Sequence, residues 1–254
     1  MNNKKIVCVI PARLKSTRFP KKMLATLKGK PLLQWVWDSA RKVKIFDDVV
    51  FAVDAEEIAQ LIDNFGGKYF MTSESCKSGT DRLVELLQRN LIKADIWVNW
   101  QGDEPFIQEP MILDLLQSCA KEDSDVWTLK KKIVNIEEAT SPQFAKIVCD
   151  HRGYAIYFSR SQIPYYRDAI DESKKIFYKH VGLYAFTSES LRKISHLQPC
   201  AIETAEQLEQ LRFLYNQLRI RVHETQYEVI GIDLPEHLAL AEAYLDKQNS
   251  LRKI

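Results

Sequence analysis

The chain has 254 residues, of which 46% are hydrophobic and 28% charged, and its formal net charge is +2. A chain of this size can bury a core without disulfides or structural metals, and the composition excludes a disordered or fibrous protein. The near-neutral charge argues against a protein whose partner is nucleic acid.

Targeting signals and membrane spans are not expected. The apolar run that follows MNNKK is only five residues long, too short for a signal peptide, and no segment approaches the roughly 20 apolar residues of a membrane span. The five cysteines are scattered and never spaced as CxxC, which favours neither a disulfide framework nor a zinc site. We therefore expect a reduced, cytoplasmic protein without membrane insertion.

Strand-like and helix-like segments alternate in the first half of the chain. The apolar patterns predict strands at residues 6–10, 49–53, 68–72 and 96–100, and helices at 31–43, 56–65 and 80–90. Short apolar strands separated by helices are typical of βαβ units in a mostly parallel sheet that is covered on both faces. The sequence therefore predicts a doubly wound α/β sandwich of three layers.

The second half is less regular. Strands are predicted at 125–133, 145–150, 154–160, 179–186 and 221–226, some of them antiparallel, and helices at 206–218 and 235–248. Leu208, Leu211, Leu214 and Leu218 form the core-facing stripe of the first helix. Because no Gly/Ser-rich or Pro-rich linker interrupts the chain, one domain over residues 1–254 with a small protruding subregion is expected.

A basic loop, PARLKSTRFPKKM at residues 11–23, follows the first strand. Ligands of open α/β sheets collect beyond the carboxyl ends of the strands. Arg13, Arg18 and Lys22 are therefore candidates for holding phosphates, together with backbone N–H groups of the turn. The loop matches neither the Walker P-loop nor GxGxxG, so an ordinary solvated loop remains the alternative.

Three further motifs place polar residues at turns that follow strands. In SGTDR, Ser78 or Thr80 caps a helix whose N-terminus can also face a nucleotide. In QGDEP, Asp103 is a candidate Mg²⁺ ligand, or a residue of a charged turn. In GIDLP, Asp233 either caps a helix or completes a metal site with Asp103.

Taken together, these motifs resemble one family. IPARLKSTRFP, MTSESCKSGTDR, VNWQGDEPFI, YAIYFSRSQIP, HVGLYAF, EQLEQLR and GIDLPEHL follow the order of their counterparts in CMP-Kdo synthetases, the 3-deoxy-manno-octulosonate cytidylyltransferases. The resemblance extends from Ile6 to about Leu245. It implies a nucleotide-diphospho-sugar transferase fold (Rossmann-like) with a mixed, mostly parallel sheet, and a homodimer formed through an arm at roughly 150–190.

The resemblance also implies the reaction and its residues. CMP passes from CTP to the anomeric hydroxyl of Kdo, pyrophosphate leaves, and Mg²⁺ is required. The catalytic set is Lys22, Asp103 and Asp233, and the two aspartates hold the metal. The nucleotide set is Pro11, Arg13, Ser16, Lys22, Ser78, Gly79, Arg82 and Asp103. The sugar-acid set is Gln101, Arg160, His180, Tyr184, Glu209 and Gln210, in which the planar guanidinium of Arg160 suits the ulosonate carboxylate.

The sequence departs from the family pattern at several positions. Lys21 replaces a glycine, so that either the turn avoids a positive φ or the loop is shifted, and the additional lysine is a candidate phosphate contact. Met23 replaces a proline, and Trp100, Ala185 and Thr187 stand where other residues are usual. The changes around Trp100 and Ala185 leave open a modified ulosonic acid, such as 8-amino-Kdo or another nonulosonate, as the substrate. A non-catalytic nucleotide-sugar-binding relative is a second alternative, which the loss of Asp103 or Asp233 would have favoured; both are present.

Overall fold

The computed structural model describes residues 4–121, 123–169 and 171–251. This part of the chain folds into two compact units. The first unit comprises residues 5–94, 99–109 and 228–251, and the second comprises 4, 95–98 and 110–227 with the two gaps. The single domain over 1–254 with a subregion at 150–190 stays a prediction.

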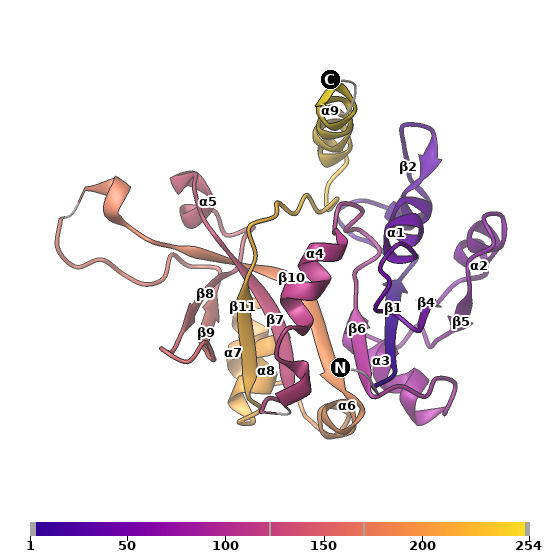
Figure 1. Cartoon of the computed structure of the whole chain (residues 1–254), viewed down its shortest axis with the longest axis horizontal. Helices are drawn as coiled ribbons and strands as arrows, with labels where there is room; N and C mark the ends of the chain where they lie inside the picture. The colour runs from indigo at the N-terminus through magenta and orange to yellow at the C-terminus, as the bar shows by residue number, and fades with distance from the viewer. Residues whose placement is uncertain (1–3, 122, 170, 252–254) are drawn as a thin grey trace. The chain divides into compact units, whose positions relative to one another are not determined.

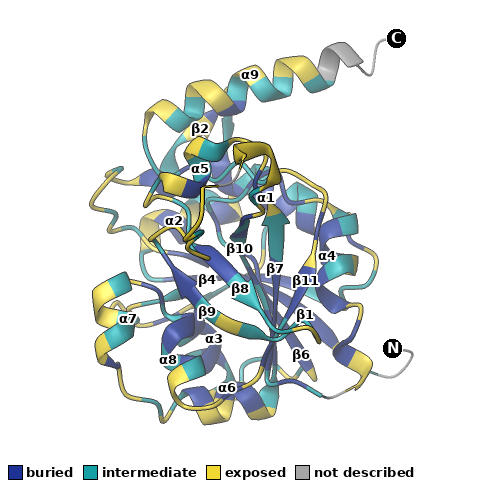
Figure 2. Ribbon diagram, turned by 90° about the vertical axis from the view of Figure 1, so that its left-hand side faces the viewer, coloured by how far each residue is buried: buried dark blue, intermediate teal, exposed yellow. Residues whose placement is uncertain are grey.

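Three parallel strands form the centre of the first unit, in the order β1 (Ile6–Ala12), β4 (Asp48–Val53) and β5 (Tyr69–Met71) (Figure 1). All seven residues of β1 are buried, as the dark ribbon of Figure 2 shows. The connections run through helices, as expected for parallel neighbours. These are α1 (Leu32–Ala40) and α2 (Glu56–Asp63), while α3 (Gly79–Gln88) follows β5.

A smaller apolar cluster completes the first unit. It joins the hairpin of β2 (Thr26–Leu27) and β3 (Lys30–Pro31) to the C-terminal helix α9 (Glu236–Leu251) through Leu27, Leu32, Phe106, Ile232 and Ala241. The chain between the basic loop and β2 forms the short 3₁₀ helix η1 (Lys22–Leu24). Burial of Ile232 in this cluster fixes the position of the next residue, Asp233.

The second unit contains a mixed set of strands. β11 (Ile220–Glu224) runs parallel to β7 (Val126–Lys132), and β7 pairs antiparallel with the long strand β10 (Tyr178–Thr187). β8 (Lys146–Cys149) pairs antiparallel with both β10 and β9 (Ala155–Ser159). β6 (Ile96–Asn99), whose last residue belongs to the first unit, lies next to β10. The predicted antiparallel strands of the second half are confirmed.

The helices of the second unit are mostly short. They are α4 (Glu109–Leu116), η2 (Cys119–Lys121), α5 (Ile136–Thr140), η3 (Glu172–Lys174), α6 (Ser188–Ile194), α7 (Ala201–Glu206) and α8 (Gln210–Tyr215). The prediction of one helix over 206–218 is wrong, because α7 ends at Glu206 and Gln207 adopts a left-handed conformation with φ 53°. The stripe is core as expected at Leu208, Leu211 and Leu218, whereas Leu214 is only half-buried.

Candidate active site

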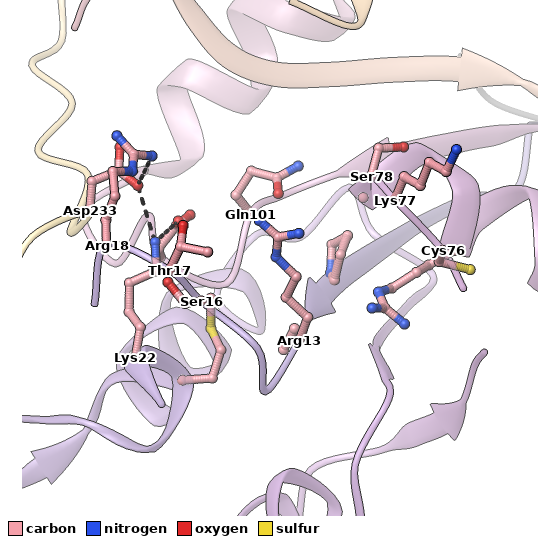
Figure 3. A pocket seen from close by; sticks show the side chains of 16 residues that line it. Arg13, Ser16, Thr17, Arg18, Lys22, Cys76, Lys77, Ser78, Gln101 and Asp233 are labelled. Carbon is pink, nitrogen blue, oxygen red and sulfur yellow. Dashed lines mark hydrogen bonds and ion pairs between the residues drawn. The ribbon is translucent and has the colours of Figure 1, made fainter. Parts of the chain in front are cut away.

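A pocket opens in the first unit where β1 ends and α3 begins (Figure 3). Its walls come from the basic loop, the first turn of α3 and the segments around Asp103 and Asp233. The lining residues are Pro11, Ala12, Arg13, Ser16, Thr17, Arg18, Lys22, Met23, Cys76, Lys77, Ser78, Gly79, Arg82, Gln101, Asp103 and Asp233. All the residues predicted to bind nucleotide or metal therefore line one pocket, and Gln101 of the sugar-acid set lies with them.

The QGDEP segment reaches the pocket through backbone pairing with β1. The amide of Trp100 donates to the carbonyl of Val9 at 3.0 Å, and the amide of Gly102 donates to the carbonyl of Pro11 at 3.3 Å. A Cβ at Gly102 would come within 2.9 Å of the Pro11 carbonyl oxygen, so a side chain there would push the strand away. Glycine at this position thus brings Asp103 against the end of β1.

Asp103 and Asp233 converge on one cationic group. The amide of Ile232 donates to the carbonyl of Asp103 at 2.9 Å, which joins the two segments. The Nζ of Lys22 donates to Asp103 Oδ2 at 2.5 Å and to Asp233 Oδ1 at 3.1 Å. Arg18 Nη2 also donates to Asp233 Oδ1, at 3.1 Å, as the dashed lines of Figure 3 show. The carboxylate of Asp233 therefore contacts two cationic side chains of the pocket.

Lys22 stays charged in this arrangement. Its side chain is 7% exposed. Burial by itself would lower the pKa of its ammonium, but the charges and hydrogen bonds of Asp103 and Asp233 outweigh that effect and raise the pKa above its ordinary value. The ammonium lies between two carboxylates, where a metal cation shared by them would lie.

A third carboxyl group, that of Glu104, is buried close to Asp103 and Asp233. Burial, together with the charges of Asp103 and Asp233, raises its pKa well above the ordinary value, which favours the neutral acid. Its Oε2 is buried without a hydrogen-bond partner. A Cβ at Gly231 would come within 2.8 Å of Glu104 Oε1, so the absence of a side chain at Gly231 makes room for this carboxyl.

The five cations of the basic loop have different partners. Arg13, Arg18 and Lys22 line the pocket, as the sequence predicts. Lys15 instead pairs with Glu74 at 2.7 Å. Lys21 is not among the pocket-lining residues and pairs with Glu57 at 3.3 Å, so its contact with phosphate stays a prediction.

Lys21 also adopts φ 54°, so the expectation that the turn avoids a positive φ is wrong. The turn keeps the conformation that favours glycine and places a lysine in it, which carries a strain cost. That strain is compatible with the loop because the next residue, Lys22, begins η1 and is held by both carboxylates. The pocket thus retains its geometry despite the substitution.

The start of α3 is a capping box. Ser78 Oγ accepts the amide N–H of Asp81 at 3.1 Å, and the Asp81 carboxylate accepts the amide of Ser78 at 3.1 Å. Of the two caps considered, Ser78 is therefore the one used. Thr17, Cys76 and Lys77 also line the pocket and were not predicted, although each is next to or within one of the quoted motifs.

The other five residues of the sugar-acid set lie in the second unit. β10 contains an irregularity at which Val181 faces Leu129 while Tyr184 faces Thr128. In a regular strand, the Cα atoms of residues four apart are about 13 Å from each other. Here the rings of His180 and Tyr184 are 5.3 Å apart, and His180 Nε2 lies 2.9 Å from Thr128 Oγ1. The irregularity thus gathers His180 and Tyr184 around one residue.

The surroundings of Thr128 favour one tautomer of His180. The single proton of the Thr128 hydroxyl lies within reach of the carbonyl oxygens of Leu183 at 2.9 Å and Val181 at 3.2 Å, which can only accept. This arrangement favours the tautomer in which His180 Nε2 carries the proton and donates to Thr128 Oγ1. Although part of the side chain remains exposed, burial of the ring lowers the pKa of His180 to about 3, so the imidazole is neutral at physiological pH.

We call Thr128, His180, Tyr184, Glu209 and Gln210 the polar cluster: Glu209 acts on Tyr184 through its charge, and Gln210 follows Glu209 at the start of α8. Burial, and then the charge of Glu209, raises the pKa of Tyr184 well above its ordinary value, so its hydroxyl stays protonated. Gln210 is 3% exposed, and its Nε2 is buried without a hydrogen-bond partner. A buried donor without an acceptor is costly, so this amide is suited to a ligand oxygen.

Arg160 is held by backbone carbonyl groups. Its Nε donates to the carbonyl of Glu206 at 2.8 Å and its Nη1 to that of Pro142 at 2.8 Å, with a longer contact from Nη2 to Gln207. Most of its N–H groups are thereby used within the protein. A bidentate grip on a sugar carboxylate stays a prediction, and these contacts instead show Arg160 fixing the turn between α7 and α8.

The departures near the sugar region have local structural roles. Trp100 is fully buried, and its indole N–H donates to the carbonyl of Glu104 at 2.9 Å. Ala185 is fully buried on β10 opposite Trp127, and the side chain of Thr187 caps α6. Within the described chain, none of these three residues lines the pocket.

The described residues contain no group of three or more His, Cys, Asp or Glu side chains that could hold a metal ion by themselves. A cation between Asp103 and Asp233 would need further oxygen ligands, which substrate phosphates and water commonly supply to Mg²⁺. No helix in this part of the chain is long and apolar enough to cross a membrane.

Comparison with known proteins agrees with this site. A family model described as cytidylyltransferase matches residues 7–220. The 3-deoxy-manno-octulosonate cytidylyltransferase of Geobacter sulfurreducens is 43% identical over 242 residues, covering 92% of this chain and 96% of its own. That of Porphyromonas gingivalis is 44% identical over 252 residues, covering 97% and 98%.

Solved structures show the same fold. A structure of CMP:2-keto-3-deoxy-manno-octonic acid synthetase in complex with CTP has a TM-score of 0.88 and 39% identity, and covers 96% of this chain and 99% of its own. The 4-diphosphocytidyl-2C-methyl-D-erythritol synthase of Anaerococcus prevotii, at 14% identity and a TM-score of 0.60, shares the fold alone. The predicted mixed, mostly parallel α/β fold is thus confirmed, and the chain belongs to the 3-deoxy-manno-octulosonate cytidylyltransferase family.

Proposed function

We propose that the chain transfers CMP from CTP to the anomeric hydroxyl of Kdo, forming CMP-Kdo and pyrophosphate, for the synthesis of lipopolysaccharide. The observation that carries this proposal is one pocket in which Arg13, Arg18 and Lys22 face two convergent carboxylates at the end of β1. Its relatives of 43 to 44% identity carry the name of this activity, and the structure with CTP matches over 96% of the chain.

The cations of the pocket suit a triphosphate. Phosphoryl transfer depends mainly on positioning and on positive charge directed at oxygens that gain charge in the transition state. Arg13 and Arg18 present planar guanidinium groups, and Lys22 presents a compact ammonium that burial keeps close to the two carboxylates. Ser78 and Gly79 bring the N-terminus of α3 to the same wall, where backbone N–H groups favour an anion.

The carboxylates fit Mg²⁺. Asp103 and Asp233 already share one cationic group, the ammonium of Lys22, and carboxylate oxygen is the donor that Mg²⁺ prefers. When bound there, the metal would neutralise phosphate charge and lower the pKa of a coordinated hydroxyl. Lys22 would then contact the phosphates instead. The two carboxylates would thus bind the Lys22 ammonium without nucleotide and the metal with it.

The polar cluster suits an oxygen-rich sugar acid. His180 is neutral, the Tyr184 hydroxyl is protonated, and the Gln210 amide has a buried donor without a partner. These groups match hydroxyl and carboxyl oxygens without adding net charge. Nearby, Arg160 holds the turn that precedes Glu209.

The test is to incubate the purified chain with CTP, Mg²⁺ and Kdo and to measure pyrophosphate. We expect pyrophosphate release that depends on both substrates. Parallel reactions with 8-amino-Kdo and other nonulosonates identify the sugar, and a faster reaction with one of these would change the substrate assignment. Binding of CTP without turnover on any 3-deoxy-ulosonic acid would contradict the enzymatic function and favour a non-catalytic relative.

The proposed dimer is supported by exposed apolar side chains in the second unit. The amide of Ile133 donates to the carbonyl of Phe177 at 2.9 Å. The neighbours of these residues, Val134 and Ile176, are 90% and 47% exposed, and Tyr165 is 85% exposed. Such side chains are suited to a partner surface, here a second copy of the chain. Light scattering after gel filtration tests this proposal: the native chain should have the mass of a dimer, and V134D should shift it to a monomer.

The proposed cytoplasmic location rests on the substrate CTP and on the cysteines, which are all free in the structure. Immunodetection of the chain in separated cytoplasmic, membrane and periplasmic fractions tests it. Recovery in the periplasmic fraction would contradict it.

A further inference from the structure

Asp54, at the end of β4, is a buried carboxylate that no motif of the sequence singled out. Its Oδ1 accepts the amide N–H of Leu14 at 2.8 Å, and its Oδ2 accepts Nη2 of Arg82 at 2.7 Å. The side chains of Asp54 and Arg82 are 7% and 2% exposed, so this ion pair is almost fully removed from water. A carboxylate in such a place persists because both of its oxygens are used.

These contacts connect the walls of the pocket. Leu14 belongs to the basic loop, and Arg13 and Ser16 of the same loop line the pocket. Arg82 lies in the first half of α3, and its Nη1 donates to Thr72 Oγ1 at 2.6 Å and to the carbonyl of Ser73 at 3.2 Å, beyond the end of β5. One carboxylate therefore links the loop after β1 to the helix and the strand ends that form the other wall.

Arg82 consequently has protein partners on both of its terminal nitrogens. It lines the pocket, but its guanidinium is directed to Asp54, Thr72 and Ser73. The sequence-based role of Arg82 in nucleotide binding stays a prediction. The direct contacts show it as the partner that neutralises Asp54, so that the carboxylate does not repel an anionic ligand.

We infer that Asp54 is a positioning residue, which holds the basic loop in the conformation that receives the triphosphate. This inference rests on the proposed function. A loop that is already ordered loses little conformational entropy when the ligand binds, and its cations are already at the required places. Loss of the bond to Leu14 would free the loop, whereas the carboxylates of Asp103 and Asp233 would be unchanged.

A matched control lies at the opposite end of the same strand. Asp47 Oδ2 accepts the amide N–H of Ile6 at 2.7 Å, which is the same kind of bond at the start of β1. Ile6 is not among the pocket-lining residues. A merely structural role predicts that the variants D54N and D47N behave alike, whereas a positioning role predicts that only D54N affects the nucleotide.

The experiment compares wild type, D54N and D47N by their melting temperatures, by isothermal titration with CTP and Mg²⁺, and by steady-state kinetics. We expect D54N to weaken CTP affinity and raise the KM for CTP about tenfold, because the neutral asparagine amide has one acceptor oxygen and cannot serve both Leu14 and Arg82 as the carboxylate does. The KM for Kdo should change less than about threefold. D47N should leave CTP affinity within about twofold of wild type and lower the melting temperature less than D54N, since Asp47 accepts only the amide of Ile6.

Two measurements keep the inference falsifiable. Because D54N leaves the Arg82 charge unpaired, D54N/R82Q is compared with R82Q; both should fold, and the double variant should bind CTP more weakly than R82Q, since only the double variant also lacks the carboxylate that holds Leu14. Hydrogen exchange without ligand should be faster over residues 13–18 in D54N but not in D47N. Unchanged CTP affinity and unchanged exchange in D54N would overturn the inference. If wild type binds no CTP, the proposed function fails, and the exchange measurement still tests whether Asp54 orders the loop.

Discussion

The pocket of the first unit and the polar cluster of the second contain opposite kinds of chemistry. In the pocket, charges are paired with charges: Lys22 and Arg18 contact Asp233, and Lys22 also contacts Asp103. In the polar cluster, His180 is held neutral by burial and Gln210 has a buried donor without a partner. The triphosphate is thus matched by charged side chains at strand and loop ends, and the sugar acid by polar groups on a strand and a short helix that, apart from Glu209, are uncharged.

The comparison predicts that the loss of one pocket carboxylate affects chemistry most. D103N should lower turnover about 10³-fold while the protein stays folded, because it weakens the proposed ligand of Mg²⁺ and leaves the core intact. The matched control is D246N, on α9, whose carboxylate pairs with Lys28 at an exposed position. Pyrophosphate release and the melting temperature measure the two effects. Retained Mg²⁺-dependent turnover in D103N would contradict the assignment.

The next prediction concerns whether a metal cation can replace the Lys22 ammonium in the pocket. In K22Q the ammonium between the carboxylates is gone, so affinity for Mn²⁺ in the absence of nucleotide should rise several-fold, while CTP affinity falls about tenfold. Electron paramagnetic resonance of free Mn²⁺ and titration with CTP measure these changes. K21Q is the control, since Lys21 pairs only with the exposed Glu57 in the described structure. Weaker Mn²⁺ binding in K22Q would show that Lys22 does not occupy the cation position.

The polar cluster should respond differently, with stability and binding moving in opposite directions. Q210L removes a buried amide donor that has no partner, so the free energy of unfolding should increase by about 1 kcal/mol. The KM for Kdo should rise several-fold and the KM for CTP should not change. Urea unfolding and kinetics with each substrate varied separately measure this. A loss of stability with unchanged KM for Kdo would assign Gln210 to the core.

The smallest effect concerns pH and stability. An unfolded imidazole has a pKa of about 6.5. Burial lowers that of His180 to about 3 and that of His223, which bonds to Ser118 at 2.7 Å, to about 4. The unfolded chain therefore binds more protons as pH falls below 6.5, and stability is lost toward pH 4 by at most about 1.4 kcal/mol per pH unit for each histidine.

This pH prediction is checked by urea unfolding between pH 7 and pH 4.5, comparing wild type with H223Q. The variant should lose less stability over this range, although it starts from a lower value because the bond to Ser118 changes. Arg221, Asp123, Asp114 and Lys121 also act on His223, and Arg221 and Lys121 oppose its protonation as burial does. An equal slope in both proteins would show that His223 does not titrate between the two states.

Local patterns predicted most elements and the charged members of the pocket, because periodicity records which side faces the core and because strand ends carry polar residues. The family resemblance added the other predicted members of the pocket. Local patterns did not predict the break at Gln207. The apolar spacing continues from Leu208 to Leu218, but Arg160 takes the carbonyl of Glu206 and the chain turns there. Nor did they predict Asp54, whose partners Leu14 and Arg82 are 40 and 28 residues away.

The sequence by itself determined the family, the α/β alternation and the set of residues around the pocket, since these depend on local spacing and on ordered motifs. Tertiary structure decided that Lys21 adopts a positive φ and pairs with Glu57, and that His180 and Tyr184 meet at Thr128. Each of these outcomes depends on a hydrogen bond or a strand irregularity between distant segments, and distant pairing leaves no periodic signal in a single chain.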